Sequence, residues 1–170
     1  MIYFNGGKII IRDMKDTDPQ AIHAQEMAQG HHRTPESFAN RLADRRAGLA
    51  VPLVAEYFGD IAGYVNVYRR PGKDGKNRCE IEDLGVFVKY RNRGIGSNLM
   101  DVAEQIAAGY SGAVHLAVGL HSGYGAAQRM YARRGYVPDG SGVWYGGAPL
   151  AAYANCKNDD GLVLWMSKKL

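Results

Sequence analysis

Long hydrophobic runs are missing from this 170-residue sequence, and no apolar stretch approaches the roughly 20 residues of a membrane-spanning helix. The amino-terminal segment MIYFNGGKIIIRDMKD lacks the basic start and apolar core of a secretory signal. Cysteine is also scarce: Cys79 and Cys156 lie far apart with no C-x-x-C spacing, which predicts free thiols in a reducing compartment. We therefore expect a cytoplasmic protein with no membrane partner.

Charge of one sign is not concentrated anywhere. The 21 Lys and Arg residues are nearly balanced by 17 Asp and Glu residues, and both signs are scattered along the chain, for a formal net charge of +4. Because nucleic-acid-binding proteins usually gather positive charge on one face or arm, no nucleic acid partner is expected, although the balance suits an anionic ligand. No metal site is expected either, since metal-ligand spacing is missing among His23, His31, His32, His115 and His121.

Apolar residues are plentiful: 46% of the sequence is hydrophobic and 10% is aromatic, enough for the core of one compact domain. No internal repeat or low-complexity tract divides the chain, so we expect a single domain over residues 1–170. Cys79 falls in an apolar run and is interpreted as a small buried hydrophobe, not as an acyl carrier.

Hydrophobic periodicity and turn residues predict a mixed order of strands and helices. The expected elements are a strand over 8–14, helices over 19–30 and 34–48, a hairpin of strands 49–58 and 61–70, a loop over 71–77, a long strand over 78–90, a helix from about 94, a strand over 113–120, a helix over 124–135, a strand starting at Tyr136 and a final strand over 162–170. This order predicts an α/β fold with a mixed sheet and helices on both of its faces.

One stretch, LGVFVKYRNRGIGSNLMDVAEQ, joins an apolar strand to a helix through a Gly-Ile-Gly turn. Glycines two apart are weak evidence alone, because a chain with 22 glycines should contain about three such pairs by chance. Only the pair Gly94 and Gly96 lies between a strand and a strongly periodic helix, whose apolar stripe is Ile95, Leu99, Val102 and Ile106.

This turn has the properties of an anion site. The first-turn N–H groups from Arg93 to Ser97 would lack intrahelical acceptors, and the helix dipole adds positive charge. Glycine allows an anion to approach the backbone, and Arg91 and Arg93 add charge, so a diphosphate fits. The alternative is an ordinary strand-to-helix turn with a basic surface. A P-loop is excluded because Gly-Lys-Ser/Thr is missing, and a dinucleotide fingerprint because Leu99 replaces its third glycine.

The segment RNRGIG resembles the Arg/Gln-x-x-Gly-x-Gly/Ala signature of the GNAT superfamily of N-acetyltransferases, and AAQRMYARRGYVPDG resembles a second motif of that family. The resemblance implies a GNAT-like, mostly antiparallel twisted sheet, with acetyl-CoA as co-substrate and its pyrophosphate on the turn. The cofactor-binding residues it implies are Val86, Arg91, Asn92, Arg93, Gly94, Ile95, Gly96 and Ser97. One departure is Tyr124, which stands where the family often has an asparagine that contacts the cofactor.

Acetyl transfer to an amine needs a base for the ammonium, oxyanion stabilisation and a proton for the departing thiolate. Glu82 and Asp83 on the central strand are the candidate bases, and we choose Glu82, although a bulge in that strand would change which side chain faces the site. Tyr131 is the candidate acid, and a backbone N–H near Val86 would meet the oxyanion. The alternatives are a solvated strand carboxylate and a core tyrosine.

We therefore expect direct transfer of an acetyl group from acetyl-CoA to a primary amine in a ternary complex. A small-molecule amine is preferred as acceptor, and a protein N-terminus or lysine is the alternative. A non-catalytic acyl-CoA-binding sensor on the same fold is the rival of another class. Aromatic residues near the C-terminus would supply either a homodimer interface or core packing, and these are Trp144, Tyr145 and Trp165.

Overall fold

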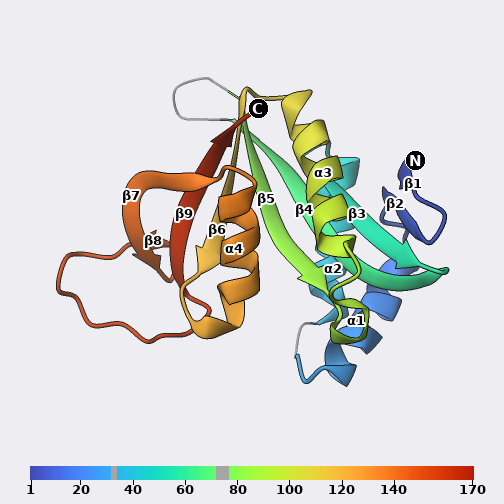
Figure 1. The fold of residues 1–170 in the computed structure, drawn as a ribbon, viewed down its shortest axis with the longest axis horizontal. Coiled ribbons are helices and arrows are strands. Elements are labelled where there is room, and N and C mark those ends of the chain that lie inside the picture. The colour runs from blue at the N-terminus through green and yellow to red at the C-terminus, as the bar shows by residue number, and fades with distance from the viewer. Residues whose placement is uncertain (32–33, 72–76) are drawn as a thin grey trace.

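A computed structural model describes residues 1–31, 34–71 and 77–170, so that most of the loop expected over 71–77, and His32, lie outside the described residues. A nine-stranded sheet with the strand order β1-β2-β3-β4-β5-β6-β9-β7-β8 organises the molecule (Figure 1). The strands are β1 (Ile2–Asn5), β2 (Ile9–Asp13), β3 (Ala50–Tyr57), β4 (Asp60–Pro71), β5 (Asn77–Val86), β6 (Ala113–Gly119), β7 (Val137–Tyr145), β8 (Ala148–Pro149) and β9 (Leu162–Lys169).

The helices follow the order that the sequence predicts. They are α1 (Asp18–Ala28), α2 (Pro35–Arg46), α3 (Ile95–Ala108) and α4 (Gly125–Arg133), with single 3₁₀ turns η1 (Val88–Tyr90) and η2 (Ser122–Tyr124). Pro19 and Pro35 both stand in the first turn of their helices, where a missing N–H costs nothing. The mixed, mostly antiparallel sheet with helices on both faces is confirmed, since among the described strands only β5 and β6 pair in parallel.

Two details of the chain differ from expectation. The short edge strands β1 and β8 were not predicted, because four and two residues carry too little periodicity to be recognised. The long strand expected to reach Tyr90 ends at Val86. Phe87 still donates its N–H to Ala62 of β4 at 3.0 Å, and Tyr90 N–H then bonds back to the Phe87 carbonyl at 2.8 Å, which closes the η1 turn.

Helices cover the two faces of the central strands differently. Tyr64, Asn66 and Tyr68 alternate along β4 toward α1 and α2, and Phe38 of α2 packs edge-on against Tyr64 at 5.4 Å between ring centres. The opposite face packs on α3, where an added Cβ on Gly63 would lie 3.4 Å from Leu99. The sheet centre is therefore covered by α1 and α2 on one side and by α3 on the other.

β5 and β6 pair over a short distance only. The parallel pairing consists of Cys79 with Val114 and Glu80 with His115, after which β5 continues to Val86 beside β4 while β6 continues beside β9. The two strands diverge toward their carboxyl ends, with the N-terminus of α3 following β5 and α4 following β6 (Figure 1). β5 and β6 therefore separate next to the Gly94–Gly96 turn.

Candidate active site

The turn after β5 has the geometry of an anion-binding helix start. Asn92 and Gly94 both adopt left-handed backbone conformations, with φ of 60° and 80°. The first helical hydrogen bond of α3 runs from Asn98 N–H to the Gly94 carbonyl at 3.0 Å. The N–H groups of Ile95, Gly96 and Ser97 therefore precede the intrahelical ladder, so they are available to an anion at the positive end of the helix dipole.

Two arginines flank this turn. Arg91 Nε donates to the Val86 carbonyl at 3.1 Å, so its side chain folds back over the end of β5. The Arg93 guanidinium lies over the ring of Tyr57 on β3 at 5.1 Å from the ring centre. Both side chains are exposed, and their charges lie close to the helix N-terminus. This arrangement suits a doubly charged diphosphate group.

The space beside the turn is one that a side chain would fill. A Cβ built on Gly96 would lie 3.6 Å from Val86 Cγ2 and 3.9 Å from the sulfur of Met130 on α4. Gly96 therefore lies between the end of β5 and α4, at the place where the two halves of the sheet diverge. A Cβ on Gly94 would meet nothing within 4 Å. The residues present fit the pyrophosphate and the pantetheine arm of acetyl-CoA, which need exposed backbone donors and a narrow space between strands.

Tyr131 is buried on α4. Its side chain packs against Tyr136 with the ring centres 5.7 Å apart, and only 6% of the residue is exposed. Burial, followed by the proximity of the Tyr124 hydroxyl, raises the pKa of Tyr131 to about 12. The phenol is therefore protonated throughout the physiological range, but its pKa lies above the ordinary value of about 8.5 for a thiol, so positioning must assist any proton transfer to a thiolate.

Tyr124 is engaged in contacts of its own. Its ring lies on Gly119 at the end of β6, where an added Cβ would come within 2.3 Å of the ring. The Tyr124 hydroxyl donates to Asp160 at 2.9 Å, and the same carboxylate oxygen contacts His121 Nε2 at 3.0 Å. Where the family often has an asparagine, this chain has a tyrosine that ties the segment before β9 to the end of β6.

The two candidate bases have different surroundings. Glu82 accepts a hydrogen bond from half-exposed Arg70 at 2.5 Å. Burial raises the pKa of Glu82, and the Arg70 charge partly offsets that effect. Asp83 has a φ of 57° and lies in the bulge of β5, where its carboxylate accepts from Arg41 at 2.5 Å. Both carboxylates point to the α2 side, because the bulge places two successive side chains on one face.

The structure brings together most of the expected site. Val86, Arg91 and the turn residues surround the end of β5, and Met130 brings α4, with Tyr131, up to Gly96. Glu82 is not part of this group. It pairs with Asn66 and lies four positions before Val86, a distance of roughly 10 Å along a bulged strand.

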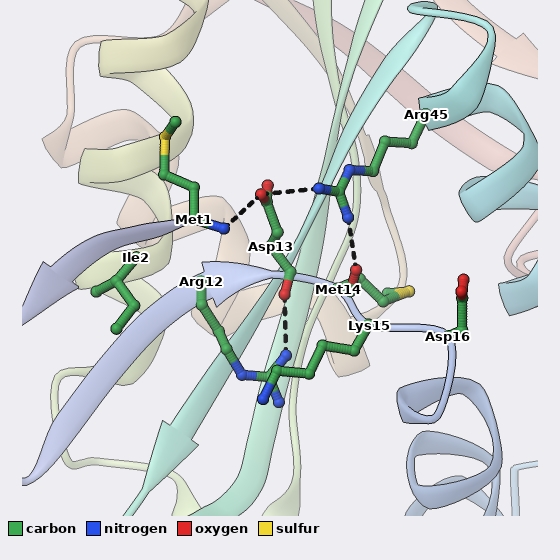
Figure 2. Close-up of a pocket in the computed structure, with 8 residues that line it drawn as sticks. All are labelled: Met1, Ile2, Arg12, Asp13, Met14, Lys15, Asp16 and Arg45. Atoms are coloured by element: carbon green, nitrogen blue, oxygen red, sulfur yellow. Dashed lines mark hydrogen bonds and ion pairs between the residues drawn. The ribbon is translucent and has the colours of Figure 1, made fainter.

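A separate cavity of about 470 Å³ lies at the other end of the sheet and is shown in Figure 2. Its lining residues are Met1, Ile2, Arg12, Asp13, Met14, Lys15, Asp16 and Arg45. Arg45 reaches across it to the Asp13 carboxylate at 2.9 Å and to the Met14 carbonyl at 2.8 Å. None of the lining residues belongs to β5, α3 or α4, so this cavity is separate from the turn between β5 and α3.

The described ranges, 1–31, 34–71 and 77–170, contain neither a metal-binding cluster nor a membrane-spanning helix. No group of three or more His, Cys, Asp or Glu side chains there is arranged to hold a metal ion. No helix in the same ranges is long and apolar enough to cross a membrane.

Comparison with known proteins identifies the family. Residues 15–136 match the acetyltransferase (GNAT) family. The comparison with curated protein sequences gave no match.

Solved structures share the fold at low sequence identity. Arabidopsis thaliana Naa50 in complex with the bisubstrate analogue CoA-Ac-MVNAL has a TM-score of 0.68 and 18% identity, over 96% of this chain and 99% of that one. A Streptococcus pneumoniae acetyltransferase of the GNAT family has a TM-score of 0.70 and 21% identity, over 95% of this chain and 99% of that one. A Salmonella typhimurium acetyltransferase that modifies the N-terminal serine of ribosomal protein L7/L12 has a TM-score of 0.75 and 11% identity, over 100% of this chain and 99% of that one.

The family match spans more than two thirds of the chain and contains both the Arg91–Gly96 turn and Tyr131. The same fold is found in solved GNAT structures across nearly the whole chain. The chain belongs to the GNAT family of acetyltransferases, enzymes that use acetyl-CoA as their co-substrate.

Proposed function

We propose that this protein is an N-acetyltransferase that moves the acetyl group of acetyl-CoA directly to a primary amine in a ternary complex, with residues 1–170 acting as one domain. The observation that supports this most is the juxtaposition of the α3 N-terminus with the end of β5 at the point where β5 and β6 diverge. That arrangement offers donors for a diphosphate and, a short distance away, a strand end for a thioester.

The residue roles follow from this placement. The N–H groups of Ile95, Gly96 and Ser97 bind the pyrophosphate. Asn92 and Gly94 give the turn its shape through their left-handed conformations. Arg91 and Arg93 add positive charge. A backbone N–H near Val86 meets the oxyanion of the tetrahedral intermediate. Tyr131 then gives its phenolic proton to the departing thiolate, and burial of this side chain supports a proton-holding role.

The amine must lose a proton before it attacks. Among the carboxylates on the α2 side, Glu82 is the candidate that the sequence suggested, and its raised pKa makes it a stronger base than an ordinary glutamate. Since roughly 10 Å of strand separates Glu82 from Val86, one or more water molecules would have to connect it to the amine.

A small-molecule amine, such as a polyamine or an aminoglycoside, is the first candidate for the acceptor. A protein N-terminus is the second, and a specific observation favours it: Naa50 is solved with an analogue that carries the peptide MVNAL, and the Salmonella enzyme modifies an N-terminal serine. Both candidates present a primary amine to the same strand end.

Thermal unfolding with and without acetyl-CoA, together with a free-thiol assay across an amine panel, tests the proposal. The panel contains spermidine, kanamycin, octapeptides with free N-terminal alanine, serine or methionine, and an N-terminally blocked peptide with one lysine. Acetyl-CoA should raise the melting temperature, and at least one amine should accelerate thiol release. Stabilisation without release from any amine would favour a non-catalytic acyl-CoA sensor, and no stabilisation would refute the acetyl-CoA site.

The aromatic residues expected at an interface or in the core contact one another within the chain. Trp144 packs edge-on against Trp165 with ring centres 6.0 Å apart, and Trp144 Nε1 donates to Ser141 at 2.9 Å. Association of two copies stays a prediction, which light scattering of the purified protein tests directly.

A further inference from the structure

The end of α1 carries a histidine back over a buried glutamate. Gly30 has a φ of 79° and ends the helix in a Schellman motif, with Gly30 N–H bonded to Met27 and His31 N–H bonded to the Glu26 carbonyl, both at 3.0 Å. In this motif the residue after the glycine lies beside the residue five positions earlier. His31 Nδ1 consequently contacts Glu26 Oε2 at 2.6 Å.

Glu26 connects this histidine to the sheet. The residue is only 4% exposed, and its other oxygen, Oε1, accepts a hydrogen bond from the Tyr64 hydroxyl at 2.6 Å. Tyr64 is itself 3% exposed, held by Phe38 on one side and by Phe87 at 6.0 Å between ring centres. The His31 side chain, by contrast, is 56% exposed. Three groups in hydrogen-bond contact thus run from the solvent to the inside of the protein.

The inner end of this chain lies at the proposed reaction site. Tyr64 pairs with Gly85 across β4 and β5, and its hydroxyl oxygen lies 3.1 Å from where a Cβ of Gly85 would be. Only glycine leaves room for the ring there. The next residue is Val86, whose backbone is assigned to the oxyanion. The Tyr64 hydroxyl therefore lies beside the strand end, about one residue from the thioester position.

Other charged groups face Tyr64 from the neighbouring elements. The Arg41 guanidinium of α2 lies 5.5 Å from the Tyr64 ring centre and is paired with Asp83 of β5. Arg41 thus donates to Asp83, while the Tyr64 hydroxyl donates to Glu26.

We propose that Tyr64, Glu26 and His31 form a proton relay that deprotonates the acceptor ammonium. This inference rests on the proposed N-acetyltransferase function and names the route by which its amine proton leaves. The ammonium gives a proton to the Tyr64 oxygen while the Tyr64 proton passes to Glu26 Oε1. In the proposed relay Glu26 starts with a proton on Oε2, shared with Nδ1 of His31, and His31 starts with its other proton on Nε2. As Oε1 gains the Tyr64 proton, the Oε2 proton moves to Nδ1 and the Nε2 proton leaves to solvent. The neutral amine then forms the N–C bond as the C–S bond breaks. Tyr131 protonates the departing thiolate, and the proton that the new amide nitrogen loses restores the Tyr131 phenol.

The relay is better placed for this step than Glu82. Tyr64 is opposite Gly85, whereas Glu82 is opposite Asn66 and is already paired with Arg70. Water would have to span roughly 10 Å from Glu82, while the Tyr64 hydroxyl reaches the strand end directly. His31 provides an exposed exit for the proton, since 56% of its side chain is exposed.

Three variants with a matched control test the relay on the full chain, with the panel amine that gives the fastest thiol release. Tyr64→Phe and Glu26→Gln break the chain with little change in shape, and His31→Ala removes the exit. Tyr68→Phe is the control: it is on the same face of β4, and its hydroxyl donates to the Asp44 carboxylate at 3.0 Å, but it lies farther from Gly85. The readouts are kcat from pH 6 to 10 and the acetyl-CoA-induced rise in melting temperature.

Tyr64→Phe and Glu26→Gln should lower kcat about 100-fold at pH 7, and the rate should now rise with pH through the pKa of the free amine, because only amine already neutral in solution reacts. Added imidazole should partly restore His31→Ala. Acetyl-CoA stabilisation should not change, and Tyr68→Phe should match the wild type.

Unchanged kcat and an unchanged pH profile in Tyr64→Phe would overturn the relay. A parallel loss of acetyl-CoA stabilisation would also overturn it, because that loss indicates a structural role. If Glu82→Gln alone produced the pH change, Glu82 would be the base. A wild type that binds acetyl-CoA but acetylates no amine would refute the proposed function, and the relay with it.

Discussion

The guanidinium of Arg41 on α2 donates to the carboxylate of Asp83, a residue in the bulge of β5, at 2.5 Å. Arg41 is 5% exposed and its Nη1 atom has no hydrogen-bond partner among the described residues. Asn66 adds a donor to the same carboxylate oxygen at 3.4 Å. This ion pair therefore connects the bulge of β5 to α2.

Asp83→Asn should destabilise the protein strongly. Asparagine tolerates the left-handed conformation at φ 57°, so the main loss is the charge that balances buried Arg41. Removing one partner of a buried pair costs about 3 kcal/mol, equivalent to roughly 10 °C in melting temperature for a chain of this size. Asp16→Asn is the control, because Asp16 pairs with Arg46 where both side chains are more than half exposed. Equal melting temperatures for the two variants would contradict this account.

Gly96→Leu should abolish acetyl-CoA binding while leaving a folded protein. A leucine side chain there would extend between Val86 and Met130, into the space assigned to the cofactor, at a position with ordinary helical geometry. Thermal unfolding should show no stabilisation by acetyl-CoA in this variant. Gly109→Ala, at the other end of α3, is the control and should be stabilised like the wild type. A normal acetyl-CoA response in Gly96→Leu would place the cofactor elsewhere.

Tyr131→Phe should reduce turnover without affecting cofactor binding. If the phenol protonates the thiolate, its removal should lower kcat about 100-fold and leave the acetyl-CoA-induced stabilisation unchanged. Since burial raises the pKa of Tyr131 to about 12, the wild-type rate should show no decline from loss of this proton below about pH 11. A decline centred near pH 8 would assign the acid to another group. Equal kcat values in wild type and variant would show that Tyr131 is a core residue only.

The Gly94–Gly96 turn was predictable because the sequence itself contains a strand, a basic turn and a helix in succession. The positions of the Glu82 and Asp83 carboxylates could not be predicted. Asp83, in the bulge, pairs with Arg41, which is 42 residues away in the sequence, and no local sequence pattern indicates that pairing. The Tyr64–Glu26 contact has the same difficulty. The contact between Glu26 and His31, in contrast, had a local signal. Gly30 ends the helix, and a glycine at that position brings the next residue beside the residue five positions earlier.

Glu104→Gln should weaken the attachment of α4 and β9 to α3. Glu104 of α3 accepts from Arg134, just after α4, at 2.8 Å and from Lys168 of β9 at 2.6 Å. Burial alone would raise the pKa of Glu104, but these two cations outweigh it and lower the pKa below its ordinary value of 4.5. Charge-assisted hydrogen bonds of this kind contribute about 1.5–3 kcal/mol each, and the amide oxygen of Glu104→Gln can still accept from one of the two cations.

The direction of the pH effect follows from that lowered pKa. A carboxylate whose pKa is lower in the folded than in the unfolded state stabilises the folded protein fully at pH values above its unfolded-state pKa. This contribution is lost as the pH falls through its folded-state pKa. The difference in unfolding free energy between wild type and Glu104→Gln, measured in urea, should therefore be about 1–3 kcal/mol at pH 7 and should shrink below about pH 4. Asp101→Asn removes a mostly exposed partner of the same Arg134 and should cost less than about 1 kcal/mol at any pH. A difference for Glu104→Gln that stays constant from pH 7 to pH 3 would mean that packing, and not the ionised carboxylate, makes the contribution.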